Sequence, residues 1–128
     1  MATAHADSYT AIAAVIAEYF DGLHYSDSER LARVFHPRAH YVSPTEHPLM
    51  YRSMDEYFPI VDARPSPASR GEVRQDRIIS IELGGPVLAF VRAECAIGPK
   101  RFTDFLTLVH TDGRWQIMSK VFHFDLQN

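Results

Sequence analysis

The chain has 128 residues, of which 46% are apolar and 23% charged, which is typical of one globular domain spanning residues 1–128. Its 13 Lys and Arg against 16 Asp and Glu give a net charge of −3, which argues against nucleic-acid binding because that requires clustered cations. Its single cysteine excludes an intrachain disulfide, and no apolar run reaches the roughly 20 residues of a membrane span. We therefore expect a cytoplasmic protein without nucleic-acid or membrane partners.

A first helix is predicted from the spacing of apolar residues near the N-terminus. They recur every three or four positions, so they share one face of a helix of about four turns. Asp7 or Ser8 can cap its start. The apolar stripe predicts that this helix covers a sheet, and its members are Tyr9, Ile12, Ile16, Tyr19, Phe20 and Leu23.

Two shorter helices are predicted from capping boxes, in which a Ser and a Glu three residues later satisfy each other's backbone amides. One opens at Ser26 and ends before Pro37, because the residue preceding a proline avoids helical dihedral angles. The other opens at Ser53. Pro59 is expected to kink or shorten it, since proline lacks an amide donor and crowds the preceding turn.

Most of the second half predicts strands joined by tight turns. A Pro-rich loop at residues 64–69 precedes them, and one short strand at residues 39–43 lies earlier in the chain. The later strands cover residues 73–83, 87–97, 102–110 and 115–124, separated by Gly84–Gly85, Gly98–Pro99 and Asp112–Gly113. Helices followed by strands indicate an α+β fold with an antiparallel sheet.

Two-residue turns at Gly98–Pro99 and Asp112–Gly113 would fix which side chains share a face of this sheet. The more apolar face is expected to pack on the helices and carries Val91, Ala93, Cys95, Phe102, Asp104, Leu106, Leu108, Trp115, Ile117, Val121 and His123. The outer face carries Arg92, Glu94, Thr103, Phe105, Thr107, Met118, Lys120, Phe122 and Phe124. Large aromatic side chains are seldom left in water as a patch, so we expect this outer face to form a homodimer.

Several stretches, taken in order, carry a resemblance to a known family. They are residues 19–23, Leu31 with residues 35–37, and residues 64–67, 71–72, 101–108, 112–117 and 120–122. The order of elements resembles the nuclear-transport-factor-2-like fold, a cystatin-like cone in which N-terminal helices pack on a curved antiparallel or mixed sheet. Within that superfamily, which includes ketosteroid-isomerase-like and SnoaL-like proteins, the sequence is similar to the "Putative lumazine-binding" family of small bacterial proteins.

The resemblance implies a pocket for a small, planar organic molecule. Relatives on this fold include isomerases, dehydratases, cyclases and non-catalytic binders, so the fold alone does not choose the function. The residues themselves must supply that argument.

Asp104 is the first candidate for chemistry. A carboxylate on the inner face must be paired or hold its proton, because desolvation disfavours its charged form. Either state suits a general acid or base acting on an enolisable ligand, whereas hydrogen bonds from a helix end or a buried side chain would make Asp104 structural. His123 is predicted one diagonal step away and is either its catalytic partner or a partly exposed histidine near the chain end.

Aromatic and histidine side chains are the candidates for the pocket wall. A tyrosine hydroxyl in an apolar pocket can donate to a ligand oxygen, although such rings also serve simply as core. His36 either reaches the mouth of the cone or caps the second helix. Glu94 is expected in an outer charge network and enters the cone only if the register shifts by one residue. The ligand-binding candidates are Tyr19, His36, Tyr41, Tyr57, Phe102 and Trp115.

Three functions follow from these observations. The first is a homodimeric domain that binds a small organic molecule in an apolar pocket. The second is an enzyme of the isomerase or dehydratase kind that uses Asp104 as general acid or base, and the third is a protein-interaction domain. No metal or cofactor is expected, because the seven histidines lack ligand spacing and no glycine-rich loop opens a helix.

Overall fold

The computed structural model describes the backbone of residues 2–127 and the side chains of residues 6–127. Its helices are α1 (Ala2–His24), α2 (Ser28–Val34), α3 (Met54–Ala63) and the 3-10 turn η1 (Ala68–Arg70). Its strands are β1 (Phe35–Ser43), β2 (Met50–Ser53), β3 (Arg77–Leu83), β4 (Leu88–Ile97), β5 (Lys100–Thr111) and β6 (Arg114–Leu126). The expected α+β class is confirmed.

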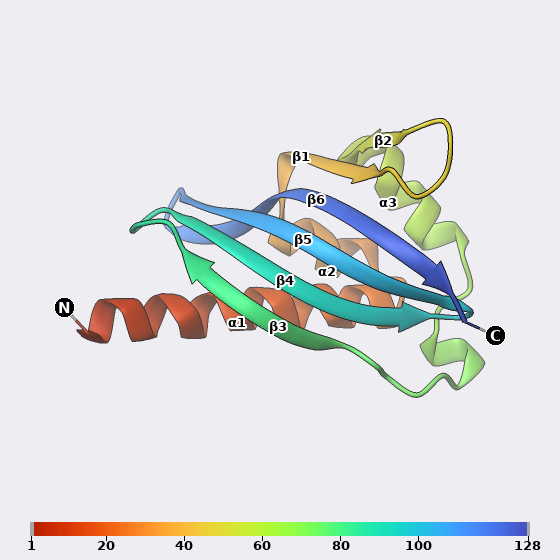
Figure 1. The fold of residues 1–128 in the computed structure, drawn as a ribbon, viewed down its shortest axis with the longest axis horizontal. Helices are drawn as coiled ribbons and strands as arrows, with labels where there is room; N and C mark the ends of the chain where they lie inside the picture. Colours follow the sequence, from red (N-terminus) through yellow and green to blue (C-terminus); the bar gives the residue numbers. More distant parts are fainter. Residues whose placement is uncertain (1, 128) are drawn as a thin grey trace.

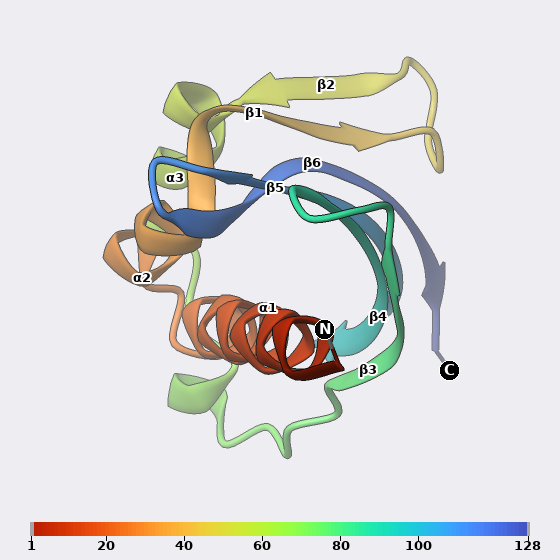
Figure 2. The same cartoon turned by 90° about the vertical axis from the view of Figure 1, so that its left-hand side faces the viewer.

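The strands form one mixed sheet in the order β2-β1-β6-β5-β4-β3 (Figure 1). The neighbours β1 and β6 run parallel, and the other adjacent strands run antiparallel. Figure 2, viewed along α1, shows the sheet curving around this helix, with α2 and α3 at the β1–β2 side. The core lies between the concave face of the sheet and the helices, so a side chain on that face is buried.

The first helix is longer than the sequence predicts. Because α1 begins at Ala2, Asp7 and Ser8 lie inside it and do not cap its start. Tyr9 is exposed, and the buried stripe begins at Ile12. The rest of the predicted stripe is buried as expected.

The two shorter helices begin in different ways. The predicted capping box at Ser26 is wrong: the N-cap of α2 is Asp27, whose carboxylate accepts the amides of Glu29 and Arg30. The capping box at Ser53 is confirmed, with both of its reciprocal hydrogen bonds to Glu56. Pro59 does not stop α3, which continues to Ala63.

The strand boundaries also differ from the prediction. The strand expected at residues 39–43 starts at Phe35, and the one expected at residues 73–83 starts at Arg77. The short strand β2 was not predicted. The Asp112–Gly113 turn is confirmed, with φ of 55° and 80°, the pair of positive values that a type I′ hairpin requires.

A β-bulge in β6 changes which residues enter the core. Leu108 pairs with Ile117 as expected, but Thr107 then pairs with Ser119, so Met118 is an extra residue in β6. Since side chains alternate between faces, one extra residue reverses the facing of everything after it. Lys120, Phe122 and Phe124 are therefore buried on the concave face, and Val121 and His123 are exposed on the outer face, which corrects the predicted assignment.

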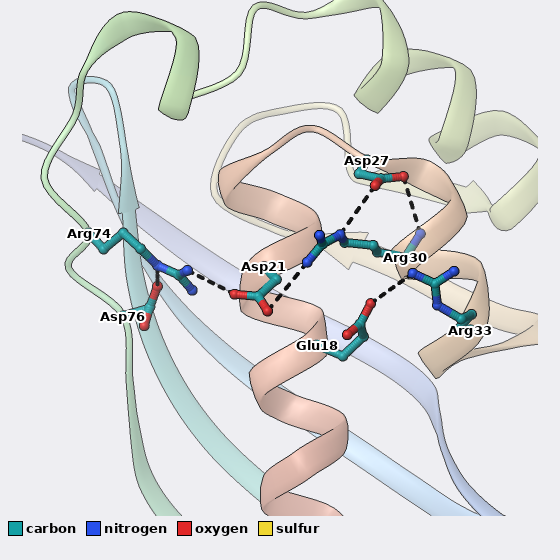
Figure 3. Close-up of polar contacts among 7 residues, drawn as sticks. All are labelled: Glu18, Asp21, Asp27, Arg30, Arg33, Arg74 and Asp76. Carbon is teal, nitrogen blue, oxygen red and sulfur yellow. Dashed lines mark hydrogen bonds and ion pairs between the residues drawn. The ribbon is translucent and has the colours of Figure 1, made fainter.

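A network of ion pairs holds α2 and the segment before β3 against the C-terminal half of α1 (Figure 3). Asp21 of α1 is its centre, at 2.8 Å from Arg74 and 3.5 Å from Arg30. The remaining pairs are Arg30–Asp27, Arg74–Asp76 and Arg33–Glu18. These contacts fix the end of α1 that carries Tyr19.

No helix of the described residues has the length and apolar character needed to cross a membrane.

Candidate functional site

A buried polar cluster lies between α1 and the concave face of the sheet. The Tyr19 hydroxyl donates a 2.5 Å hydrogen bond to Oδ2 of Asp104, and the Lys120 ammonium lies 3.9 Å from the same oxygen. Asp104 is 0% exposed and Lys120 is 3% exposed. Oδ1 of Asp104 has no hydrogen-bond partner among the described residues. The carboxylate is therefore held by two side chains and is not saturated by backbone donors.

The Lys120 ammonium is surrounded by aromatic rings. Its Nζ lies 4.8 Å from the Phe122 centroid, 5.1 Å from those of Tyr19 and Tyr41, and 5.9 Å from that of Phe102. Burial is the largest single effect on the pKa of Lys120 and lowers it, but Asp104 and, in decreasing order, Tyr57, Tyr41 and Cys95 together raise the pKa above its usual value. Lys120 is therefore charged at neutral pH and is paired with the Asp104 carboxylate.

The neighbouring tyrosine and cysteine side chains are held in their neutral forms. Burial, and then the negative charge of Asp104, raise the pKa of Tyr19 well above its usual value. Burial also raises the pKa of Tyr41 to about 12, against an opposing effect of Lys120. Burial raises the pKa of the Cys95 thiol to about 12, so this cysteine is not a nucleophile at neutral pH.

A cavity of about 700 Å³ is lined by residues of α3 and of the end of β6. These two segments lie at the same end of the molecule (Figure 1). The cavity volume is in the range of sites that bind small organic molecules. Its wall comes from β1, β2, α3, the segment around η1, the β4–β5 turn and the end of β6. The cavity is therefore built from segments far apart in the sequence.

Five aromatic rings form a continuous surface along this cavity. Tyr41 and Tyr57 are stacked with centroids 4.1 Å apart, and Tyr41 also lies 4.8 Å from Phe122. Phe102 continues the surface at 5.7 Å from Phe122 and 5.8 Å from Phe124. Three of these rings, those of Tyr41, Phe102 and Phe122, also contact Lys120. The aromatic wall thus separates the buried ammonium from the cavity.

Four cationic side chains and one carboxylate line the same cavity: Arg52, Arg64, Arg70, Lys100 and Glu72. Glu72 pairs with Arg70 at 2.7 Å and accepts the Gly98 amide at 2.8 Å, which fixes the β4–β5 turn. The hydrogen bond from the Gly98 amide and the contact with Arg70 both lower the pKa of Glu72. The remaining cations give the cavity an excess of positive charge in a chain whose net charge is −3.

The predicted site residues fall into three groups. Tyr41, Tyr57 and Phe102 line the cavity, whereas Tyr19 and Asp104 lie in the buried cluster behind the wall. His36, His123 and Trp115 lie elsewhere.

Each of those three residues has a local partner. His36 accepts the Arg38 amide at 3.0 Å on β1. The predicted pairing of His123 with Asp104 is wrong because the bulge turns His123 outward, where it contacts Thr45 at 2.7 Å and Asp125 at 2.9 Å. Trp115 packs edge-on against His110 at the start of β6.

Other residues were missed from the sequence. Lys120 and Phe122 were assigned to the outer face, and Arg64 was treated only as the start of a loop. The alternation in β6 contains one usable indication: residues 122 and 124 are both Phe, while residues 123 and 125 are polar, which is the reverse of the expected facing.

Among the described residues no group of three or more His, Cys, Asp or Glu could hold a metal ion.

A curved sheet around a long helix, with a cavity at one end, defines the cone-shaped α+β fold of nuclear-transport-factor-2-like proteins. The chain belongs to the "Putative lumazine-binding" family, whose model matches residues 7–123. It is similar to Aldolase FrzH of Cladobotryum sp, with 29% identity over 117 residues that cover 90% of each chain.

Two solved structures share the fold over nearly the whole chain. An NTF-2-like protein of unknown function from Silicibacter pomeroyi is 25% identical, with a TM-score of 0.81 over 94% of this chain and 98% of that one. An NTF2-like protein of unknown function from Shewanella baltica is 26% identical, with a TM-score of 0.81 over 94% and 95% of the two chains.

Proposed function

We propose that the protein binds a small organic molecule with a planar aromatic part in the 700 Å³ cavity. The observation that carries this proposal is the continuous surface of five rings along the cavity. Offset and edge contacts between aromatic rings add about 0.5–1.5 kcal/mol each beyond area burial, so a flat ligand gains from several of them. Membership of the "Putative lumazine-binding" family supports the same class of ligand.

The test is calorimetric titration with lumazine and with 2-naphthamide, two neutral planar probes. Replacing Phe124, which lines the cavity, with Leu removes one ring at nearly constant volume and is expected to weaken binding about 2- to 10-fold. The matched control is Phe105→Leu, because Phe105 lies on the outer face and does not line the cavity. Failure of both probes to bind, or equal losses in the two variants, would contradict the proposal.

A second candidate function is an enzyme of the isomerase or dehydratase kind. It is favoured by the buried Oδ1 atom of Asp104, which has no hydrogen-bond partner among the described residues. Asp104 and Lys120 lie behind the aromatic wall, so a ligand must displace part of that wall to reach them. The simplest step is then removal of a proton from the carbon next to a ligand carbonyl by the Asp104 carboxylate, with the Lys120 ammonium stabilising the enolate oxygen. Similarity to a protein named an aldolase supports enolate chemistry as the class to examine.

The enzyme proposal is tested by proton exchange. Enolisable ketones that bind the wild-type protein should lose their α-proton NMR signals in D₂O, and Asp104→Asn should abolish this loss while keeping the Tyr19 hydroxyl bonded. Exchange at the wild-type rate in Asp104→Asn would exclude Asp104 as the base.

We also propose that the protein is a homodimer through the outer face of the sheet. Of the aromatic residues predicted there, Phe105 remains, whereas Phe122 and Phe124 are buried. Phe90, Phe105 and Val121 are 37%, 44% and 41% exposed there, and the rings of Phe90 and Phe105 lie 5.5 Å apart. Sedimentation at micromolar concentration should give a dimer for the wild type and a monomer for Phe105→Glu. Tyr51→Glu is the control, because exposed Tyr51 lies on β2 outside this patch. A wild-type monomer would refute the proposal.

A further inference from the structure

Three buried polar atoms at the cavity have no hydrogen-bond partner among the described residues: the Tyr57 hydroxyl oxygen and the Nε and Nη2 atoms of Arg64. Both residues line the cavity. Buried polar groups in folded proteins are almost always bonded, and a charged donor without an acceptor is especially unfavourable. The three atoms therefore indicate that an acceptor from outside the chain belongs here.

The two Arg64 atoms define the shape of that acceptor. Nε and Nη2 lie on one edge of the planar guanidinium, and their N–H bonds are spaced to meet the two oxygens of one carboxylate. Arg64 is the C-cap of α3, and its position is fixed by a 3.4 Å bond from its own amide to the Val61 carbonyl. Its side chain is therefore free for a ligand rather than required by the helix.

The surrounding charge favours an anion. Arg52 and Lys100 line the same cavity and, like Arg64, form no ion pair with a described residue, whereas Arg70 is neutralised by Glu72. The Lys100 ammonium instead lies 4.5 Å from the Phe124 ring. An anion that enters the cavity thus meets three cations without an acidic partner.

We propose that Arg64 binds the carboxylate of an aromatic or heteroaromatic acid through Nε and Nη2, with the Tyr57 hydroxyl donating a third hydrogen bond. This inference rests on the proposed binding function and narrows its ligand class. Tyr57 stacks on Tyr41, so the ring attached to a carboxylate at this position lies against the aromatic wall. A planar carboxylate uses these three donors fully, whereas a tetrahedral phosphate needs more.

The experiment compares three probes of the same ring system: 2-naphthoate, its neutral isostere 2-naphthamide and 2-naphthyl phosphate. Dissociation constants are measured by calorimetry on the wild-type protein at fixed pH and salt. The wild type is expected to bind 2-naphthoate about 10- to 100-fold more tightly than 2-naphthamide, the range for charge-assisted hydrogen bonds.

Three variants separate the explanations for that preference. Arg64→Gln should remove most of it and leave 2-naphthamide binding within about threefold of wild type. Arg64→Lys keeps the charge but lacks the paired Nε and Nη2 donors, and should also lose most of the preference. Arg101→Gln changes the net charge by the same amount at an exposed position outside the cavity and should keep the full preference. Melting curves confirm that each variant is folded.

Each result has a defined meaning. Equal affinity of the wild type for 2-naphthoate and 2-naphthamide would overturn the carboxylate assignment and leave the proposed function intact. A preference kept in Arg64→Gln or in Arg64→Lys would overturn the role of the Arg64 edge, and tighter binding of 2-naphthyl phosphate would overturn the ligand class. Binding of none of the probes would overturn the proposed function itself.

Discussion

Replacing Lys120 with Met is expected to destabilise the fold strongly, although no backbone contact is lost. Methionine fills the space between the aromatic rings but leaves the Asp104 carboxylate buried without its counter-ion. Removing one member of a buried pair costs about 3–5 kcal/mol, a large part of the roughly 5–15 kcal/mol that stabilises a domain. For a chain of this length, a loss of about 3 kcal/mol lowers Tm by roughly 10 °C.

The reasoning is tested by a double-mutant cycle in urea. Asp104→Asn keeps an acceptor for the Tyr19 hydroxyl but leaves the Lys120 ammonium without its carboxylate, so it should also be destabilising. The double variant buries neither charge and should be no less stable than the worse single variant, with a coupling of about 2 kcal/mol or more. Additive effects would refute the claim that the two residues form a charge pair.

The exposed Lys100 provides the matched control. Its ammonium also lies near a ring, 4.5 Å from that of Phe124, but in contact with solvent. Lys100→Met should therefore cost less than about 1 kcal/mol, the value of an exposed cation–π contact. An equal cost for the two lysines would mean that burial of Lys120 is not the cause of its effect.

Three other changes have expected outcomes. Folding raises the pKa of Cys95 from 9.0 to about 12. The contribution of the neutral thiol to stability is therefore complete below pH 9 and is lost as the pH rises toward 12. Cys95→Ala should flatten the stability–pH curve in that range by about 1.4 kcal/mol per pH unit. Gly22→Ala should cost about 1–3 kcal/mol in urea despite the better helix propensity of Ala, because the new Cβ would lie 2.5 Å from buried Leu31. A gain in stability would contradict that packing argument. Asp21→Ala breaks two ion pairs (Figure 3) but should cost only about 1 kcal/mol, less in 1 M salt, since Asp21 and its arginine partners are about one-third exposed.

Local chemistry made much of the fold predictable. The Asp112–Gly113 turn requires two positive φ angles, and this dipeptide is among the few that adopt them readily. The capping box at Ser53 and the buried stripe on α1 follow from spacing alone. Such features depend on residues a few positions apart, so a single sequence contains the information needed to find them.

The candidate site depends on information that the sequence spreads over long distances. Both turns flanking β5 have the predicted length, yet the bulge at Met118 reverses the facing of Lys120 and His123. Nothing at Met118 itself marks a bulge, because the extra residue is accommodated by the pairing of β5 and β6. The cavity is a stronger case, since Tyr57 and Arg64 of the α3 segment meet Phe124 of β6 only after the whole sheet has closed around α1.

The position of Lys120 is difficult to explain as a requirement of folding alone. A buried ion pair can often be replaced by apolar residues of similar volume with no loss of stability, so a core at this point does not need a lysine. Three of the four rings around its ammonium line the cavity, and the cavity is itself lined by an excess of cations. Lys120 lies on one side of the aromatic wall and the cavity-lining cations lie on the other. Their charges are weakly screened there because the local dielectric is low. The planar carboxylate that we propose as ligand fits this arrangement, with its charged end at Arg64 and its ring against the aromatic wall.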